Sequence, residues 1–312
     1  MEVLITGGAG FIGSNVAKML EEKGVTVYIL DDFSAGNFKN IVDLNCEVIC
    51  ADVLDREIYK KLPQVDAVIH EAAITDTTLD DPRKMMMVNF TGFINILNFC
   101  LKKKIKLVYA SSAGTYGNGK IPMEEEQPLN PLNYYAYSKY LCDRKVMQIK
   151  GSKDLPPIIG LRYFNVYGEG EAHKGKASSM IYQLYLQMKR DLPPRLFKYG
   201  EQKRDFIYIR DVALATTKAL EVDETTILNV GTGQPRSFNE VVSIINSTLG
   251  KQLSPDYFDN PYEEVYQSFT QADVRRAEKI LKFTAHYSLE EGIKTYLNLL
   301  QKSKEKEDVS GD

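Results

Sequence analysis

The sequence lacks a surplus of basic residues, a long apolar run and a cysteine-rich segment. Its 39 lysine and arginine residues are outnumbered by 42 aspartate and glutamate residues, and the formal net charge of −3 argues against a nucleic-acid-binding protein. No uninterrupted apolar stretch reaches the length of a membrane span. No basic segment precedes the first apolar residues, so neither a membrane partner nor a signal peptide is predicted. We therefore expect a cytoplasmic protein.

Cysteine is scarce, and its pattern excludes the usual metal and redox motifs. Cys46, Cys50, Cys100 and Cys142 form no C-x-x-C pair, and none has a histidine at metal-ligand spacing. We interpret all four as small buried apolar residues in a reducing compartment and predict no metal site. The remaining composition, 44% hydrophobic and 26% charged, is ordinary for a globular protein.

The N-terminus carries a nucleotide-binding signature. An apolar run at residues 3–5 leads into a G-x-x-G-x-x-G turn and then a helical pattern. Gly7 permits the tight turn, Gly10 lets the backbone approach a pyrophosphate, and Gly13 lets helix and strand pack closely. The unpaired N–H groups at the helix start, near Phe11 and Ile12, would face the phosphates. This pattern predicts an α/β protein with a doubly wound parallel Rossmann sheet.

The ends of the next two predicted strands carry acidic residues for the adenosine half of a dinucleotide. The second strand ends in Asp31 and Asp32, about twenty residues past the glycines, where an acid meets the ribose. Asp52 and Val53 follow the third strand and lie beside the adenine. Asp31 favours NAD, because a carboxylate repels a 2′-phosphate, whereas Lys39 in the intervening loop would reach the 2′-phosphate of NADP.

Small residues follow the fourth strand, and a polar residue interrupts the next helix. Ala72 and Ala73 would let the backbone approach the ligand, and we interpret His70, at the strand end, as structural. A long helix is predicted over 83–103, with Asn89 on or near its inward face. A buried asparagine must find partners, so Asn89 is either a helix–sheet bridge or a tether on the cofactor side.

A serine, a tyrosine and a lysine form the candidate catalytic set. Ser112 follows the fifth strand, in the crevice where such sheets bind ligands. Tyr135 and Lys139 are four residues apart, so both project from one helix face. Tyr140 and Arg144 have the same spacing, but the first pair lies in the first turns of the helix, near the strand ends.

These residue types suit the oxidation of an alcohol by a nicotinamide. A base must take the hydroxyl proton while hydride leaves the carbon, and a free tyrosine has a pKa near 10, too high for a good base at neutral pH. The positive charges of Lys139 and of the oxidised nicotinamide would favour tyrosinate. We therefore predict that Tyr135 acts as acid and base and that Ser112 orients the substrate oxygen. Lys139 would stabilise the tyrosinate form of Tyr135 and bind the cofactor ribose.

Taken together, these motifs resemble the extended short-chain dehydrogenase/reductase superfamily, in its nucleotide-sugar branch. The motifs are the glycine turn at 7–13, Ser111-Ser112-Ala113, Tyr135-x-x-x-Lys139 and Arg204-Asp205-Phe206. The segments 161–168, 173–175, 204–206 and 266–273 are similar to the ADP-glycero-manno-heptose 6-epimerases, which act in lipopolysaccharide inner-core precursor synthesis. The resemblance implies an ADP-sugar substrate, a tightly held NADP, a six-keto intermediate and a homo-oligomer.

The resemblance also implies roles for residues outside the glycine turn and the tyrosine helix. It places Phe164 with the cofactor and makes Lys174, in a mobile loop over the site, a second proton carrier for the inverted product; Lys176 close by leaves open which lysine acts. The other implied substrate-binding residues are Asn165, Phe197, Arg204 and Tyr266. A guanidinium such as Arg204 can grip phosphate oxygens, although it could instead pair with an acid such as Asp205.

Three other functions are weighed against this interpretation. A dehydratase needs an acid pair after the strand-five hydroxyl, but Ala113 and Gly114 follow Ser112. A UDP-sugar C4 epimerase shares the serine, tyrosine and lysine, and only the Lys174 loop and the Tyr266 segment argue against it. A non-catalytic NAD(P)-sensing regulator commonly loses the tyrosine or the lysine, and both are present.

The order of the predicted elements divides the chain into two lobes. We expect residues 1–165 and 205–231 to form the Rossmann domain, with a strand over 204–211 returning to it. Residues 166–204 and 232–301 would form a smaller, mixed C-terminal substrate lobe. The charged residues 302–312 would form a disordered tail.

Overall fold

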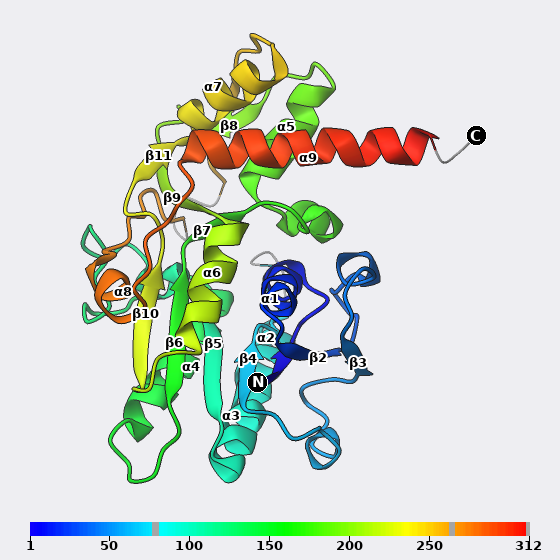
Figure 1. Ribbon diagram of the computed structural model, residues 1–312. Helices are drawn as coiled ribbons and strands as arrows, with labels where there is room; N and C mark the ends of the chain where they lie inside the picture. The colour runs from blue at the N-terminus through cyan, green and yellow to red at the C-terminus, as the bar shows by residue number, and fades with distance from the viewer. Residues whose placement is uncertain (77–80, 262–265, 310–312) are drawn as a thin grey trace.

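The computed structural model describes residues 1–76, 81–261 and 266–309, of which 303–309 are described by their backbone alone. A seven-stranded sheet forms the centre of the protein, and all of its strands are parallel (Figure 1). These strands are β1 (Glu2–Thr6), β2 (Thr26–Asp31), β3 (Glu47–Cys50), β4 (Ala67–His70), β5 (Lys106–Ser112), β6 (Ile158–Tyr163) and β10 (Thr226–Val230). They lie in the order β10-β6-β5-β4-β1-β2-β3, which confirms the predicted doubly wound sheet.

Helices cover both faces of this sheet because its strands are apolar on both sides. Val3 and Ile5 of β1 belong to one buried core, and Leu4 belongs to the other. The first core is covered by α1 (Phe11–Glu22) and α6 (Ile209–Ala219), which pack against each other. The second is covered by α2 (Pro82–Met86), the π-helical turn η3 (Met87–Thr91), α3 (Gly92–Lys103) and α4 (Tyr134–Ile149).

The strand order reverses between β1 and β4. The chain leaves β1 through α1 toward β2, and it leaves β4 through α2 and α3 toward β5, on the other side of the sheet. At such a reversal the connections diverge, and a crevice opens outside the carboxyl ends of the strands. The motifs that the sequence analysis placed directly after the first six strands all lie at this edge.

A smaller lobe of mixed structure lies above this edge in Figure 1. One small sheet contains β7 (Asn165–Tyr167), β9 (Lys203–Tyr208) and β11 (Pro235–Ser237), and a second pairs β8 (Arg195–Phe197) with β12 (Asp256–Phe258). Its helices are α5 (Met180–Lys189), α7 (Phe238–Leu249) and α9 (Leu289–Val309). The short elements of the described chain are η1 (Phe38–Asn40), η2 (Ile58–Lys60), η4 (Ala113–Tyr116), η5 (Ala172–Ala177) and α8 (Arg275–Ile280).

The prediction of a strand over 204–211 is wrong in two respects: where the strand ends and which sheet it joins. β9 stops at Tyr208, which caps α6, and it pairs with β7 and β11 rather than with the large sheet. Asp211 lies in the first turn of α6, where a carboxylate is favoured by the helix dipole. It also accepts hydrogen bonds from the backbone N–H groups of His286 and Tyr287, each at 3.0 Å.

The structure corrects two further expectations. α9 extends to Val309, so residues 302–309 are helical rather than disordered; lysine and glutamate, which dominate this segment, are good helix formers. Residues 310–312 lie outside the described chain. Cys100 and Cys142 are buried, but Cys46 is only partly buried and Cys50 is exposed, because β3 is the edge strand of the sheet.

The predicted helix over 83–103 is continuous from Pro82 through α2, η3 and α3. Its length and composition would allow it to cross a membrane. However, Phe93, Ile96 and Leu97 are buried in the core against the sheet, so we interpret it as a core helix.

Candidate active site

The glycine turn between β1 and α1 needs glycine for two different reasons. Gly7 has a φ of +69°, and a Cβ atom there would lie 2.6 Å from the Ala72 nitrogen of the neighbouring strand end. A Cβ atom at Gly13 would lie 2.3 Å from the Gly7 carbonyl oxygen. Gly10 caps α1 without contributing a side chain. The amino end of α1 therefore keeps unpaired N–H groups for a ligand.

A cavity of about 370 Å³ opens at the carboxyl ends of the central strands. Its lining includes residues that the sequence analysis assigned to cofactor binding, to catalysis and to substrate binding. Those that line it are Gly7, Gly10, Phe11, Ile12, Gly13, Asp31, Asp32, Asp52, Val53, Ala72, Ala73, Ser112, Tyr135, Lys139, Phe164, Asn165 and Lys174.

Six of the predicted site residues do not line this cavity: Lys39, Asn89, Lys176, Phe197, Arg204 and Tyr266. Asn89 is buried and acts as a bridge, because its side-chain oxygen accepts from the Ile74 N–H (2.8 Å) and its amide donates to the Ile74 carbonyl (3.0 Å) and to Ser138 Oγ (3.1 Å). It thereby fixes the loop after β4, on which Ala72 and Ala73 line the cavity. These contacts join the helix to the loop that lines the cavity and to α4, and none of the three reaches a strand of the sheet.

Asp31 holds the adenosine end of the cavity together. It is buried and accepts hydrogen bonds from the backbone N–H groups of Ala9 (2.9 Å) and Phe33 (2.8 Å). Burial raises the pKa of Asp31, and the two N–H groups counteract that rise. Lys39 is exposed, so the only charged side chains of this loop region that line the cavity in the described chain are Asp31 and Asp32.

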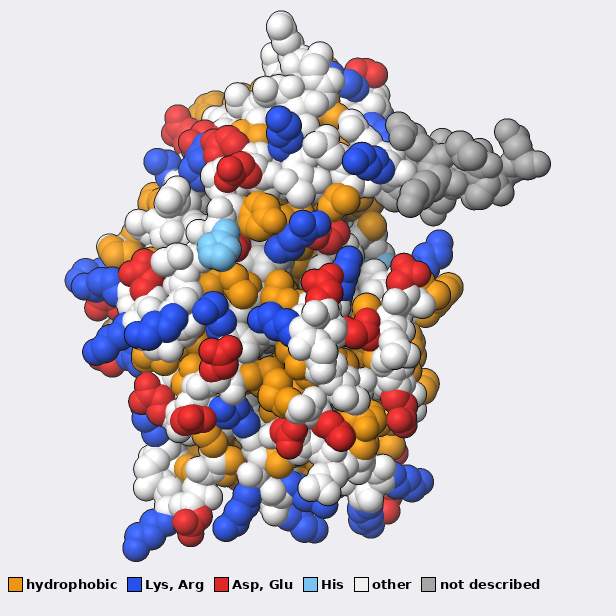
Figure 2. Space-filling model, viewed as in Figure 1, with side chains coloured by type: hydrophobic (Ala, Val, Ile, Leu, Met, Phe, Trp, Pro, Cys, Tyr) orange, Lys and Arg blue, Asp and Glu red, His pale blue; other side chains and the backbone are white. Residues whose placement is uncertain are grey.

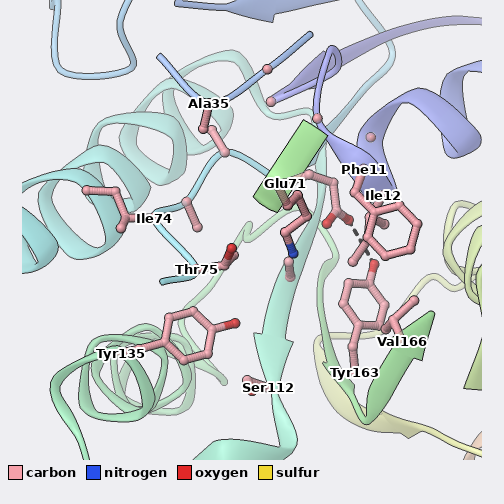
Figure 3. A pocket seen from close by; sticks show the side chains of 18 of the residues that line it. Phe11, Ile12, Ala35, Glu71, Ile74, Thr75, Ser112, Tyr135, Tyr163 and Val166 are labelled. Atoms are coloured by element: carbon pink, nitrogen blue, oxygen red, sulfur yellow. Dashed lines mark hydrogen bonds between the residues drawn. The ribbon is translucent and has the colours of Figure 1, made fainter. Parts of the chain in front are cut away.

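Tyr135, Lys139 and Ser112 converge from α4 and β5. Tyr135 and Ser112 project into the cavity from neighbouring elements (Figure 3). Lys139 is buried, with Nζ 2.8 Å from the Ala110 carbonyl oxygen and 6.0 Å from the centre of the Tyr135 ring. Ser112 Oγ accepts a hydrogen bond from the Gly114 N–H (3.1 Å), which leaves its own proton available.

The segment at η5 brings Lys174 to the cavity and leaves Lys176 outside. Lys174 Nζ lies 5.5 Å from the centre of the Phe11 ring, and burial lowers the pKa of this lysine. Lys176 is exposed. Glu171, which is fully buried, accepts from the N–H groups of Gly168 (3.0 Å) and Ser179 (2.5 Å) and holds the segment in place.

Arg204, Phe197, Tyr266 and Phe238 form a separate group next to the cavity, which we call the Arg204 cluster. The Arg204 guanidinium lies 4.7 Å from the centre of the Tyr266 ring and 5.9 Å from that of Phe238, which itself lines the cavity. The Phe197 and Tyr266 rings meet edge to face at 5.4 Å. Arg204 is buried, and burial lowers its pKa.

The alternative pairing of Arg204 with Asp205 is wrong. The Asp205 carboxylate instead accepts hydrogen bonds from the backbone N–H groups of Thr232 (2.8 Å), Gly233 (2.8 Å) and Ala272 (2.9 Å). Among the ion pairs of the described chain, none includes Arg204. A buried guanidinium among aromatic rings suits an anionic ligand.

Comparison with known proteins agrees with this geometry. Residues 3–231 match the model of the NAD dependent epimerase/dehydratase family. This chain belongs to that family. A solved structure of the Helicobacter pylori ADP-L-glycero-D-manno-heptose-6-epimerase is 39% identical, with 96% of each chain covered and a TM-score of 0.89.

Epimerases that act on UDP-sugars match the fold equally well. The Thermotoga maritima UDP-glucose 4-epimerase is 28% identical, covering 97% of this chain and 99% of its own, with a TM-score of 0.91. A mutant UDP-glucuronic acid 4-epimerase from Bacillus cereus, in complex with NAD, is 25% identical over 97% of this chain and 99% of its own, with a TM-score of 0.88. These matches support an isomerase that acts on a nucleotide sugar with a nicotinamide cofactor.

The cavity of this family member fits such a cofactor. Its glycine turn admits no side chain at Gly7 or Gly13, which leaves the amino end of α1 open to a diphosphate. Ser111 Oγ is buried at the cavity wall with no hydrogen-bond partner in the described chain, and a bound ligand would supply one. Gly7, Gly10 and Asp31 would hold the adenosine diphosphate half, and Lys139 the nicotinamide half.

Sequence reasoning missed other residues of the cavity wall, among them the polar side chains of Glu71, Tyr163 and His173. Glu71 and Tyr163 line it and contact each other at 2.8 Å. His173 lines it near Asp31, and its Nδ1 lies 3.3 Å from Asn40 Nδ2. The one available signal was Glu71 itself, a charged residue directly after a buried strand, where small residues were expected.

Acidic and basic side chains are intermixed over the face drawn in Figure 2.

Proposed function

We propose that this epimerase inverts C6 of an ADP-glycero-manno-heptose through a transient keto intermediate, in the cytoplasm, for lipopolysaccharide inner-core precursor synthesis. The observation that carries the proposal is the 39% identity to the Helicobacter pylori 6-epimerase, which extends over 96% of both chains. UDP-sugar epimerases match the fold as closely but are 25–28% identical. The similarity in sequence therefore favours the heptose substrate.

The proposed chemistry uses the three side chains at the junction of α4 and β5. A bound nicotinamide cofactor supplies the acceptor for a hydride and its return to the opposite face of the same carbon. Tyr135 takes the hydroxyl proton, the charge of Lys139 favours the tyrosinate, and Ser112 donates its free proton to the substrate oxygen. In support of this proposal, all three residues line the same cavity.

Inversion at C6 places the substrate oxygen in two positions, so we propose Lys174 as the second acid and base. It lines the cavity whereas Lys176 does not. Burial lowers the pKa of Lys174, which makes the exchange of its proton near neutral pH easier. The firm attachment of this segment through Glu171 favours a fixed proton carrier over the mobile loop that the resemblance implied.

We propose that the Arg204 cluster binds the nucleotide diphosphate of the substrate. Arg204 supplies the charge, and Tyr266 and Phe197 supply aromatic surface for a nucleotide base. Asn165, which lines the cavity and accepts a hydrogen bond from Thr270 Oγ1 (3.3 Å), is the proposed substrate contact on the cavity side. On this proposal residues 166–204 and 232–301 form the substrate lobe and residues 1–165 and 205–231 the cofactor domain, in a homo-oligomer.

We propose NAD as the cofactor, in place of the NADP that the resemblance implied. Asp31 presents a carboxylate at the adenosine end of the cavity, and Lys39, the residue expected to bind a 2′-phosphate, is exposed and does not line it. A carboxylate at this position accepts a hydrogen bond from a free 2′-hydroxyl and repels a phosphate.

The experiment is to incubate the purified protein with ADP-D-glycero-D-manno-heptose, adding no cofactor, and to resolve the two C6 epimers by chromatography. A mixture that approaches equilibrium is expected. Run in D₂O, the reaction should place no deuterium at C6, because the same hydride leaves and returns. Failure to convert the heptose even with NAD and NADP added would overturn the 6-epimerase proposal.

A UDP-sugar 4-epimerase is the second candidate, favoured by the TM-score of 0.91 to the Thermotoga maritima enzyme. The same assay with UDP-glucose and UDP-galactose tests it. Conversion of these sugars, with the heptose left unchanged, would establish this second candidate.

A further inference from the structure

Glu71 is a carboxylic acid in the cavity wall that the proposed reaction does not use. It follows β4, and its side chain lies beside Phe11 and Ile12 at the amino end of α1 (Figure 3). That helix end is where a dinucleotide of this family places its diphosphate. An ionised carboxylate next to a diphosphate is unfavourable, so the protonation state of Glu71 bears on binding.

The hydrogen-bond chain behind Glu71 favours its protonated form. Glu71 Oε1 and Thr216 Oγ1 each lie 2.8 Å from the Tyr163 hydroxyl, and Thr216 donates to the Val212 carbonyl at 2.8 Å. Three contacts need three protons, and Tyr163 and Thr216 supply one each. If Glu71 is ionised, one contact has no proton. If Glu71 is protonated it donates to Tyr163, which donates to Thr216, and all three contacts are satisfied.

The surroundings of Glu71 point the same way. Burial raises the pKa of Glu71 to about 7; a hydrogen bond in which Tyr163 is the donor and the positive charge of Lys139 act in the opposite direction. His70, next to it on β4, is buried and its pKa is lowered to about 3, so it is neutral. From the neighbouring end of α1, Phe11 and Ile12 line the cavity with apolar side chains. Lys174 reaches the same cavity from η5.

We propose that Glu71 is a cofactor-positioning residue that is protonated when the dinucleotide is bound, so that binding takes up a proton. The inference rests on dinucleotide binding by this family and not on the sugar substrate proposed above. The negative diphosphate makes the ionised form of Glu71 less favourable in the complex than in the free protein. The neutral acid keeps its bond to Tyr163 and leaves no charge to oppose the diphosphate.

The direction of the pH dependence follows from this linkage. Below pH 7 Glu71 is already protonated in the free protein, and the affinity for the dinucleotide should not change with pH. Above pH 7 each complex must take up a proton, so the affinity should fall, by up to tenfold per pH unit, until the pH reaches the higher pKa of the complex. Between pH 6 and pH 9 the expected loss is roughly 10- to 100-fold.

The test compares the wild type with Glu71→Gln and Tyr163→Phe, using NADH alone as the probe. Dissociation constants are measured by NADH fluorescence from pH 6 to pH 9, and proton uptake by calorimetry at pH 8 in two buffers of different ionisation enthalpy. Glu71→Gln keeps the shape and can donate to Tyr163, so it should bind as tightly at pH 9 as at pH 6 and take up no proton. Tyr163→Phe disturbs the same wall but keeps the carboxyl, so it should keep the pH dependence.

Two results would overturn the proposal. One is a Glu71→Gln protein whose NADH affinity falls with pH as steeply as that of the wild type; the other is proton uptake that survives the substitution. If Glu71→Gln does not fold, Glu71→Ala provides the same comparison, because it too removes the titrating group. Since no sugar is present, a failure of the 6-epimerase assay leaves this test intact.

Discussion

The cofactor end of the site is lined by residues that end or follow the strands of one sheet, whereas the Arg204 cluster is assembled from two small sheets, a loop and the first residue of α7. Gly7, Asp31 and Ala72 each follow or end a strand of the same parallel sheet. Arg204, Phe197 and Tyr266 come from β9, β8 and a loop near the end of the chain. The first arrangement offers a ligand backbone groups and short side chains, and the second would bind with long side chains.

This difference indicates that the two regions have separate functions. A sheet edge can hold the same dinucleotide in many proteins, because strand ends and a helix end present backbone groups whatever the substrate. Side chains of the small sheets can be substituted without disturbing the parallel sheet. These side chains would therefore determine the specificity for the sugar nucleotide. Substitutions in the two regions should therefore affect different steps.

The largest expected effect is that of Tyr135→Phe, which removes the proton carrier and leaves the aromatic ring. Turnover should fall by about 10³-fold, the range of general acid–base catalysis, while the dinucleotide content of the purified protein stays unchanged. The measurement is epimer formation alongside the absorbance of bound cofactor. Tyr140→Phe, on the same helix but not lining the cavity, is the matched control and should keep full turnover.

The contrast between the cofactor end and the Arg204 cluster also explains how much of each could be predicted from the sequence. The glycine turn, Asp31, Ala72 and the tyrosine–lysine pair were found because strand ends and helix periodicity are local patterns. The cavity confirms that these residues lie together. Local patterns also placed Lys39 near the cofactor, but its loop carries the side chain to the surface.

The remaining positions depend on contacts between residues far apart in the chain. The Arg204 cluster was assigned only through resemblance, because nothing near position 204 indicates that position 266 packs against it. The end of β9 was misplaced because Tyr208 and Ile209 are as apolar as a strand, whereas α6 begins at Ile209 and Asp211 contacts residues 286–287, far along the chain. Glu71 was missed because its partner, Tyr163, lies two strands away.

Lys174→Met and Lys176→Met form a matched pair within six residues of one short segment. Lys174→Met should lower turnover by about 10²-fold with little loss of bound cofactor, because it removes one proton carrier of the two. Lys176→Met should change turnover less than twofold, because that side chain is exposed and lies outside the cavity. Initial rates in both directions measure this, and equal rates for the two variants would contradict the assignment of Lys174.

Arg204→Lys tests whether the Arg204 cluster binds substrate alone. The substitution keeps the charge but loses the two parallel hydrogen bonds to a phosphate, which lowers kcat/KM for the nucleotide sugar by roughly 10- to 30-fold. The NADH dissociation constant should not change. Arg195→Lys, at an exposed residue of β8 beside Phe258, is the control. A loss of NADH affinity in Arg204→Lys would show that the two regions do not act separately.

The smallest expected effect concerns the choice between NAD and NADP. Asp31→Ser removes the carboxylate that would repel a 2′-phosphate, so the ratio of NADPH affinity to NADH affinity should rise by about tenfold, or roughly 1.4 kcal/mol. The backbone N–H groups of Ala9 and Phe33 lose their acceptor, so the melting temperature should fall as well. Lys39→Ala should leave the ratio unchanged, because Lys39 does not line the cavity. Fluorescence titration with both reduced dinucleotides measures the ratio. If Lys39→Ala lowers NADPH affinity and Asp31→Ser has no effect, the lysine closes over the bound cofactor, and the preference for NADP that the resemblance implies is restored.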